Sequence, residues 1–202
     1  LRVPLYNRMF GENGDLWFGY TQVSYWQAYN FARSAPFRET NYEPELALTF
    51  NTDFSLLGLK HRAFTVGFAH QSNGRDEPLS RSWNRLWAGF ALDRGNFMLV
   101  FKPWYRIPES SEKDNNPDIL DFAGRAELRS AYKHGDQVFS FILRNNLRAE
   151  ANRSGYELGW SLPFSKRMKG LLQLYNGYGE SLLDYDVRTR RVGFGILVED
   201  WL

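Results

Sequence analysis

The stretch HRAFTVGFAHQS, residues 61–72, alternates in character along its whole length. The even positions are Arg62, Phe64, Val66, Phe68, His70 and Ser72, with large apolar side chains at the centre of the run. The odd positions carry small or polar side chains. Because successive side chains of a strand point to opposite faces, this pattern predicts a strand with one apolar and one polar face. Helical spacing is not sustained here or elsewhere, so the fold is predicted to be all-β.

The same alternation recurs from one end of the chain to the other. Eleven candidate strands fall at 1–7, 15–28, 43–53, 61–72, 80–93, 95–106, 120–134, 136–147, 154–164, 167–178 and 189–200. Tight turns are expected at 11–14, 93–95, 135–136 and 152–155. Longer polar connections are expected at 29–42, 73–80, 107–119 and 179–188. Short and long connections roughly alternate, as they do in barrels that carry short turns on one side and long loops on the other.

Two architectures can use such strands. A soluble sandwich would bury the large residues between two sheets, whereas a membrane barrel would turn them to lipid and enclose the small and charged ones. Strands of about 10 to 14 residues match a tilted membrane crossing, and Glu127 and Arg129 place charge on the polar face. Aromatic residues collect toward strand ends: Tyr25, Trp26, Trp104, Tyr105, Tyr175 and Tyr178. We therefore predict an antiparallel transmembrane β-barrel, with the sandwich as the alternative.

Length and composition narrow the class further. The 202 residues are expected to form one domain, 1–202, and a net charge of +2 argues against nucleic acid as a partner. The chain has no Cys, which excludes disulfides, zinc–cysteine sites and thiol nucleophiles. Single-chain bacterial barrels have an even number of strands, so eleven is one short. We expect a further strand to precede Leu1.

One group of residues suggests chemistry. His70 and Ser72 lie two positions apart, so both side chains leave the same face with Cα atoms about 6.5 Å apart. If the next strand pairs His70 with Asn84, three polar side chains meet on the apolar face. A serine nucleophile, a histidine base and an amide that orients the imidazole would form a hydrolase site. Alternatively, the three are ordinary polar residues near lipid headgroups.

The sequence HQSNGRDEPLSRSWNR, residues 70–85, closely resembles the signature of the outer membrane phospholipase A family. Further segments similar to that family follow in the same order: YTQVSYWQ at 20–27, SAPFRETNYEP at 34–44, KPWY at 102–105, NPDI at 116–119 and GYGESLLDY at 177–185. The resemblance implies a twelve-stranded barrel in the outer membrane of a Gram-negative bacterium. It also implies a calcium-dependent hydrolase, active as a homodimer, that cleaves acyl esters of phospholipids and lysophospholipids with A1 and A2 activity.

The resemblance also assigns roles to single residues. It makes Ser72 the nucleophile, His70 the base and Asn84 the residue that orients the histidine, with the Gly74 backbone N–H at the oxyanion. The implied Ca2+ ligands are the Ser80 hydroxyl, the Arg75 carbonyl and, from the partner chain, the Ser34 carbonyl. Gln22 is implied to pair with its symmetry mate across the dimer interface.

Two points stay open on the sequence alone. Asn115 stands where the family's monomeric calcium site uses an acid, although Asp114 is adjacent. Gln22 has the outward parity of its strand, but a register shift of one residue would turn it inward. The rival hypothesis for function is a passive outer-membrane barrel, a porin or structural protein without catalysis. A catalytic set that faces lipid argues against it, because a pore needs its functional groups in the lumen.

Overall fold

A computed structural model describes residues 1–165 and 168–198. The strands are β1 (Arg2–Tyr6), β2 (Asp15–Trp26), β3 (Phe37–Leu56), β4 (Leu59–Ser72), β5 (Ser82–Arg94), β6 (Phe97–Ile107), β7 (Ala126–His134), β8 (Gln137–Asn145), β9 (Ser154–Pro163), β10 (Lys169–Gly177) and β11 (Thr189–Leu197). Two short helices lie in loops: η1 (Phe31–Arg33) and α1 (Ile119–Phe122). Among the residues described, no helix is long and apolar enough to cross a membrane.

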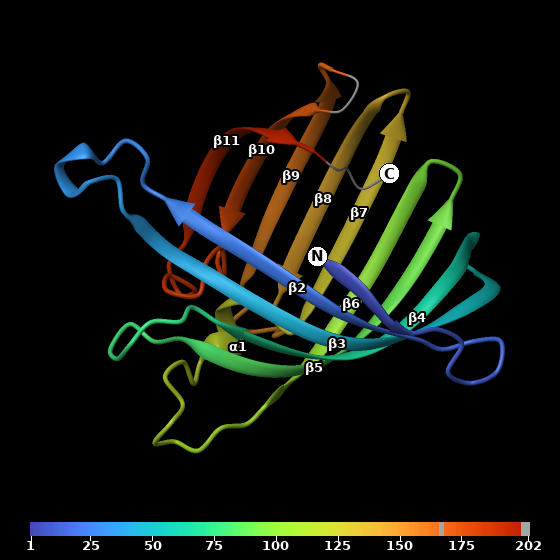
Figure 1. Ribbon diagram of the computed structural model, residues 1–202, viewed down its shortest axis with the longest axis horizontal. Helices are drawn as coiled ribbons and strands as arrows, with labels where there is room; N and C mark the ends of the chain where they lie inside the picture. Colours follow the sequence, from blue (N-terminus) through green and yellow to red (C-terminus); the bar gives the residue numbers. More distant parts are fainter. Residues whose placement is uncertain (166–167, 199–202) are drawn as a thin grey trace.

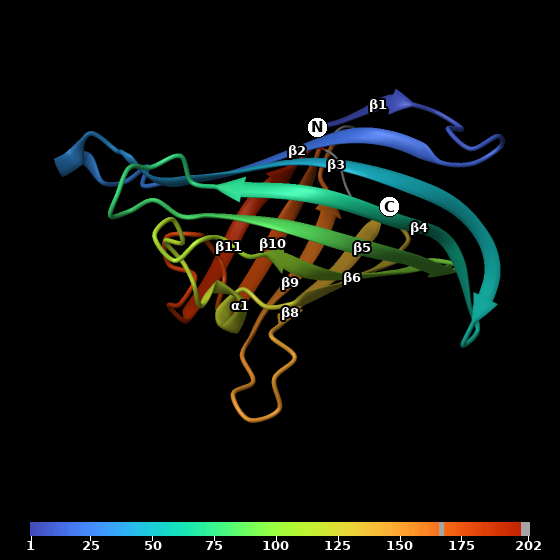
Figure 2. The same cartoon turned by 90° about the horizontal axis from the view of Figure 1, so that it is seen from below.

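The eleven strands form one antiparallel sheet in chain order, from β1 to β11. The sheet is strongly curved and wraps around an interior (Figure 1), and the view from below shows β2–β4 arching over β8 and β9 (Figure 2). Within the described residues β1 pairs with β2 alone and β11 with β10 alone. The all-β antiparallel prediction is confirmed, and the two-layered sandwich is wrong.

Three predicted boundaries need correction. β3 begins at Phe37 rather than at 43, because Glu39 and Asn41 are polar but buried in the interior, where the local pattern resembles a loop. Residues 120–122 belong to α1 and not to the start of a strand, so β7 begins at Ala126 rather than at 120. The tight turn expected at 152–155 is the end of a longer loop, and Ser154 already belongs to β9. The end of the predicted strand 189–200 lies outside the described residues.

The outer surface of the sheet is apolar and the interior is polar. Exposed large apolar side chains include Leu46, Val66, Phe68, Leu86, Phe101, Leu158, Val192 and Phe194. Several charges inside are paired, since an unpaired ion away from water is costly. Arg85 contacts Glu43 at 2.9 Å, and Glu127 accepts from Arg144 at 2.8 Å and also from Arg129. The prediction of apolar residues outside and paired charges within is therefore confirmed.

The aromatic residues do not all lie at the lipid surface. Trp26 and Tyr105 are exposed, at 61% and 63%. In contrast, Tyr25 and Trp104 line the interior cavity, and Tyr175 is buried. Neighbouring residues of a strand point to opposite faces, so of two adjacent aromatics only one can face lipid. Of the aromatic residues near strand ends, only some therefore face lipid.

Tryptophans fill much of the interior near the middle of the sheet. Trp17 and Trp87 pack together at 6.3 Å between ring centroids, against Ala47 and Ala69. Gly67 leaves the space that the Trp87 ring occupies, because a Cβ at Gly67 would lie 2.5 Å from that ring. Small residues on the polar face of the strands are therefore required by the packing of large ones.

An apolar cluster fills the interior at the long-loop end. Leu182 and Tyr185 from the loop after β10 pack against Ile119 of α1 and Trp83 of β5. Burial and a hydrogen bond donated to Asp118 raise the pKa of the Tyr185 hydroxyl above its ordinary value, so it stays protonated. The remaining interior cavity has a volume of about 590 Å³.

Candidate active site

The β4–β5 hairpin carries the predicted catalytic residues near its long-loop end. β4 ends at Ser72 and β5 begins at Ser82, and the register pairs His70 with Asn84 and Ser72 with Ser82. His70 and Ser72 have the same parity as Phe68, whose side chain is exposed on the outer surface. The pairing assumed from the sequence is confirmed, and the three side chains project outward from the barrel wall.

A hydrogen bond joins two of the three side chains across the strands. The distance between His70 Nδ1 and Asn84 Oδ1 is 2.9 Å. An amide oxygen can only accept, so the Nδ1–H of His70 donates, and in this tautomer Nε2 carries the lone pair that can take a proton. This is the tautomer that a general base next to a serine requires.

The third side chain and a nearby backbone N–H are free of partners. Within the described part of the chain the Ser72 hydroxyl makes no hydrogen bond, and the Gly74 N–H has no acceptor. Catalytic hydrogen bonds often tighten only when substrate is bound. Gly74 has a φ of 62°, a left-handed conformation that favours glycine. An uncommitted N–H two residues after Ser72 is available to an oxyanion.

Asn73 holds the loop that follows Ser72. Its side chain is buried: Nδ2 donates to the Leu79 carbonyl at 2.8 Å, and Oδ1 accepts from the N–H groups of Arg81 at 3.0 Å and Arg75 at 3.3 Å. Short polar side chains of this type commonly organise turns through such backbone contacts. The loop therefore has a defined shape that positions Gly74 and Arg75 beside Ser72.

The oxygens predicted as calcium ligands lie in two different loops. Ser80 and Arg75 belong to the loop between β4 and β5. Ser34 lies in the loop between β2 and β3, where it directly follows η1 as its C-cap and has a φ of 56°. The carbonyls of Arg75 and Ser34 accept no hydrogen bond among the residues described. The described chain also lacks any group of three or more His, Cys, Asp or Glu residues suited to a metal. A cation here would rely on hydroxyl, carbonyl and water oxygens.

Asn115 contacts the same group of oxygens. Its Nδ2 donates to Ser80 Oγ at 2.9 Å and to Glu77 Oε1 at 3.4 Å, while its Oδ1 accepts from the Ser82 N–H at 3.2 Å. The adjacent Asp114 is paired with Arg106 at 2.6 Å. Asp114 is therefore not available in place of the acid expected at position 115, and an amide donor occupies that place.

Gln22 faces outward on β2. Its neighbours Thr21 and Val23 line the interior cavity, so a register shift that turns Gln22 inward is wrong. Gln22 Oε1 accepts from the Tyr20 hydroxyl at 3.2 Å, and Nε2 lies 3.4 Å from Ser24 Oγ. Each end of the exposed amide has one partner on β2, and the second lone pair of the oxygen and the second N–H remain for a contact outside the chain.

Comparison with known proteins identifies the family. A family model described as phospholipase A1 matches residues 1–198. The chain belongs to the phospholipase A1 family. Curated members from Klebsiella pneumoniae and Escherichia coli K12 are each 42% identical over 200 residues, which is 99% of this chain and 68% of the relative.

Solved structures of phospholipase A1 family members have the same fold. Outer membrane phospholipase A from Escherichia coli matches with a TM-score of 0.94 at 42% identity, over 100% of this chain and 82% of that one. A Salmonella typhi outer membrane phospholipase, solved as a dimer with bound calcium, matches with a TM-score of 0.93 at 41% identity, over 99% and 76%. The barrel architecture predicted from alternation is thus shared with outer membrane phospholipases.

Two residues of the candidate site were not predicted. Asn73 had a local signal, because an Asn-Gly pair after a strand is typical of a turn held by side-chain contacts. Glu109 had none: it accepts from Asn84 Nδ2 at 3.2 Å, although it lies 25 positions away in the loop after β6. The sequence offers no means of selecting it from the acids of that loop.

Proposed function

We propose that this chain is a calcium-dependent phospholipase A of the outer membrane that hydrolyses acyl esters with Ser72, His70 and Asn84. The observation that carries the proposal is the His70–Asn84 hydrogen bond of 2.9 Å on the outer, apolar surface of the barrel. A polar set of this kind facing lipid has no role in a pore. A substrate that is itself a membrane lipid explains why the site faces outward.

The reaction follows from the positions of the side chains. Ser72 Oγ attacks the ester carbonyl while His70 Nε2 takes the hydroxyl proton, and the carbonyl oxygen becomes an oxyanion near the Gly74 N–H. Collapse of this tetrahedral intermediate breaks the ester C–O bond, and His70 returns the proton to the leaving alcohol. Water then releases the fatty acid by the same steps. The neutral Asn84 amide accepts from the imidazolium, so that no carboxylate contacts His70 directly on the lipid-facing surface, where a charge is costly.

The calcium proposal rests on three loop oxygens: the Arg75 and Ser34 carbonyls accept no hydrogen bond among the residues described, and the Ser80 hydroxyl accepts one from Asn115. The Ser80 hydroxyl and the Arg75 carbonyl would come from one chain and the Ser34 carbonyl from the partner subunit, and hard cations prefer such ligands. Bound there, the cation would supply positive charge to an oxyanion at Ser72. The Salmonella typhi relative, a dimer with bound calcium, supports this assignment.

We further infer activity on A1 and A2 esters and on lysophospholipids. The three side chains lie on an open surface and not in an enclosed pocket, so little in the wall distinguishes one ester from the other. Gln22 is assigned to the interface of the homodimer, where two copies of the amide could pair in lipid. An unpaired amide in lipid would cost several kcal/mol.

The rival, a passive barrel, is disfavoured by the interior as well as by the outer surface. A pore needs a continuous path of water, but the interior at the long-loop end holds the apolar cluster of Trp83, Ile119, Leu182 and Tyr185. The sheet around it carries paired charges.

The decisive experiment is ester hydrolysis of phospholipid in detergent micelles, with calcium and with chelator. Ser72→Ala is expected to abolish turnover, and chelator should abolish it in the unchanged protein. Ser82→Ala is the matched control, because the Ser82 hydroxyl is the register partner of Ser72 but lacks a histidine beside it on its own strand. Turnover that persists in Ser72→Ala would refute the mechanism.

A second measurement tests the shared calcium site. A cation bound across an interface binds the dimer better than the monomer, so calcium must tighten the dimer by the same factor. Sedimentation in detergent, with and without calcium, should show this shift in protein sulfonylated at Ser72. An unchanged monomer–dimer constant would mean that calcium is held within one chain.

A further inference from the structure

The Asn84 amide has two partners, one at each end. Its oxygen faces His70 Nδ1 at 2.9 Å, and its nitrogen donates to Glu109 Oε1 at 3.2 Å. The two ends of an amide are nearly identical in shape but opposite in function, since the oxygen accepts and the NH2 group donates. If the amide rotated by half a turn, it would offer a donor to His70 and would favour the wrong tautomer.

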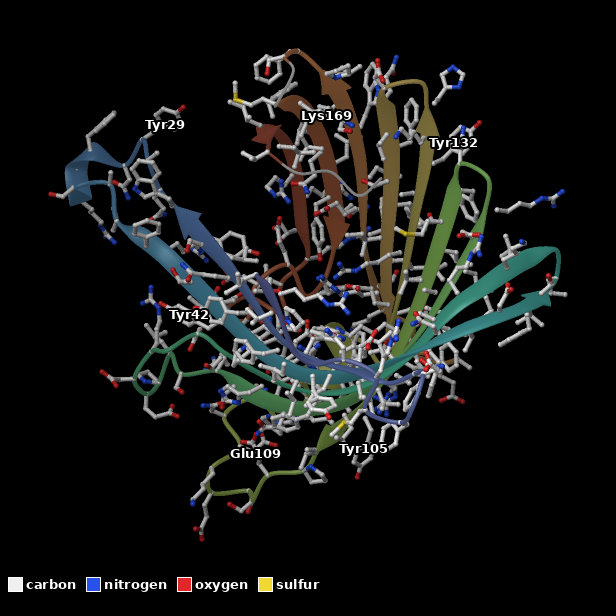
Figure 3. The ribbon with its side chains drawn as sticks, turned by 45° about the vertical axis from the view of Figure 1, so that its right-hand side comes forward. Tyr29, Tyr42, Tyr105, Glu109, Tyr132 and Lys169 are labelled. Carbon is white, nitrogen blue, oxygen red and sulfur yellow. The ribbon has the colours of Figure 1, made fainter. Side chains whose placement is uncertain are left out.

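The backbone brings Glu109 to this position. Ile107, the last residue of β6, is the register partner of Asn84 on the side away from His70. Pro108 follows, and proline restricts both its own φ and the residue before it to extended conformations. The chain therefore stays extended past the end of the strand, and Glu109 lies on the same face as Ile107. Figure 3 shows Glu109 at the opposite end of the sheet from Tyr132 and Lys169.

The charge of Glu109 is not committed to another group. Within the described part of the chain Glu109 makes no ion pair, and the Asn84 amide is its hydrogen-bond partner. A carboxylate at the protein surface has only acceptor oxygens. It therefore accepts a hydrogen bond from the NH2 group of Asn84, whereas the Asn84 oxygen, itself an acceptor, would find no donor there.

We propose that Glu109 is a positioning residue that fixes the orientation of the Asn84 amide and, through it, the tautomer of His70. This inference rests on the proposed Ser72–His70–Asn84 function. With Glu109 in place, Asn84 Oδ1 accepts from the Nδ1–H of His70, and Nε2 remains unprotonated toward Ser72. The negative charge also polarises the amide, which strengthens its support of the imidazolium that forms when Ser72 loses its proton.

Kinetics on phospholipid micelles at saturating calcium test the contact. Glu109→Ala should lower kcat by roughly two- to tenfold, the range for one supporting hydrogen bond, with little change in KM. Glu109→Gln, which keeps an acceptor oxygen, should lose less. Glu112→Ala is the matched control, an exposed acid of the same loop, and should leave kcat unchanged. An unaltered kcat in Glu109→Ala, or a change confined to KM, would overturn the proposal.

Combining substitutions separates positioning from general stabilisation of the loop. In an Asn84→Ala background, Glu109→Ala should cause no further loss, because the group that it orients is gone. In an Asn84→Asp background, Glu109 faces a second carboxylate, so Glu109→Gln should raise kcat. An equal loss in both the unchanged and Asn84→Ala backgrounds, or no gain in the Asn84→Asp background, would show that Glu109 does not act through Asn84.

The outcomes for the two proposals remain distinct. If Ser72→Ala keeps its turnover, the proposed mechanism itself fails, whatever Glu109 does. If Ser72→Ala is inactive but Glu109→Ala acts independently of Asn84, the mechanism stands and the positioning role of Glu109 is wrong.

Discussion

Replacing Asn84 with alanine would remove the acceptor that orients His70 and leave Ser72 and His70 in place. The contact is a single hydrogen bond of 2.9 Å between a neutral amide oxygen and the imidazole. In the transition state the imidazole is charged, and hydrogen bonds to charged groups contribute about 1.5–3 kcal/mol. At 1.36 kcal/mol for each factor of ten, kcat should fall roughly tenfold to 150-fold. Because Asn84 is half-buried, water can partly replace the amide, which favours the lower end.

The assay is initial-rate hydrolysis of phospholipid in detergent micelles at saturating calcium, compared with His70→Ala and Ser72→Ala. These two variants remove the base and the nucleophile, so each should lose far more activity than Asn84→Ala. KM should stay nearly constant, because Asn84 contacts His70 and not substrate. Equal, complete inactivation of all three variants would contradict the reasoning, and so would full activity of Asn84→Ala.

Three other substitutions test the dimer contact, the calcium loop and the packing of the wall. Gln22→Ala should weaken dimerisation in sedimentation experiments while calcium binding by the monomer stays the same; an unchanged dimer constant would remove Gln22 from the interface. Asn115→Asp replaces an amide donor near Ser80 with a carboxylate, so calorimetric titration should show that the monomer binds calcium about tenfold more tightly. Equal calcium affinity of the variant and the unchanged protein would place the cation elsewhere. Gly67→Ala puts a Cβ 2.5 Å from the Trp87 ring and should lower the free energy of unfolding by about 1–3 kcal/mol. Gly195→Ala, whose Cβ would meet its nearest neighbour at 4.0 Å, is the control in the same unfolding measurement, and equal effects of the two would contradict the packing argument.

Local alternation was enough to predict the strands and the faces that they present. The parity of residues 61–72 placed Phe68, His70 and Ser72 on one face, and the structure keeps them there. The register that joins His70 to Asn84 was also predictable, because a hairpin with a central turn leaves few alternatives. A period of two residues is a property of the extended backbone, so it can be recognised without knowledge of the rest of the chain.

Local alternation was less reliable where the interior decided the conformation. Glu39 and Asn41 resemble loop residues, but in β3 they bind each other at 2.6 Å and the backbone of the loop after β10. Residues 120–122 lie in a segment that resembles a strand, yet they belong to α1, which forms because the Ile119 side chain fits the apolar cluster beneath that loop. Such contacts join segments far apart in the chain and leave no periodic pattern.

The contacts that tune the site depended on tertiary structure for the same reason. Glu109 contacts Asn84 because β6 pairs with β5 and the chain runs on past Ile107. Asn115 reaches Ser80 because the loop after β6 lies against the loop after β4. Several acids and amides of that loop are equivalent in sequence. Only the pairing of the strands selects which of them comes within hydrogen-bonding distance, because a hydrogen bond needs its donor and acceptor placed to within a few tenths of an ångström.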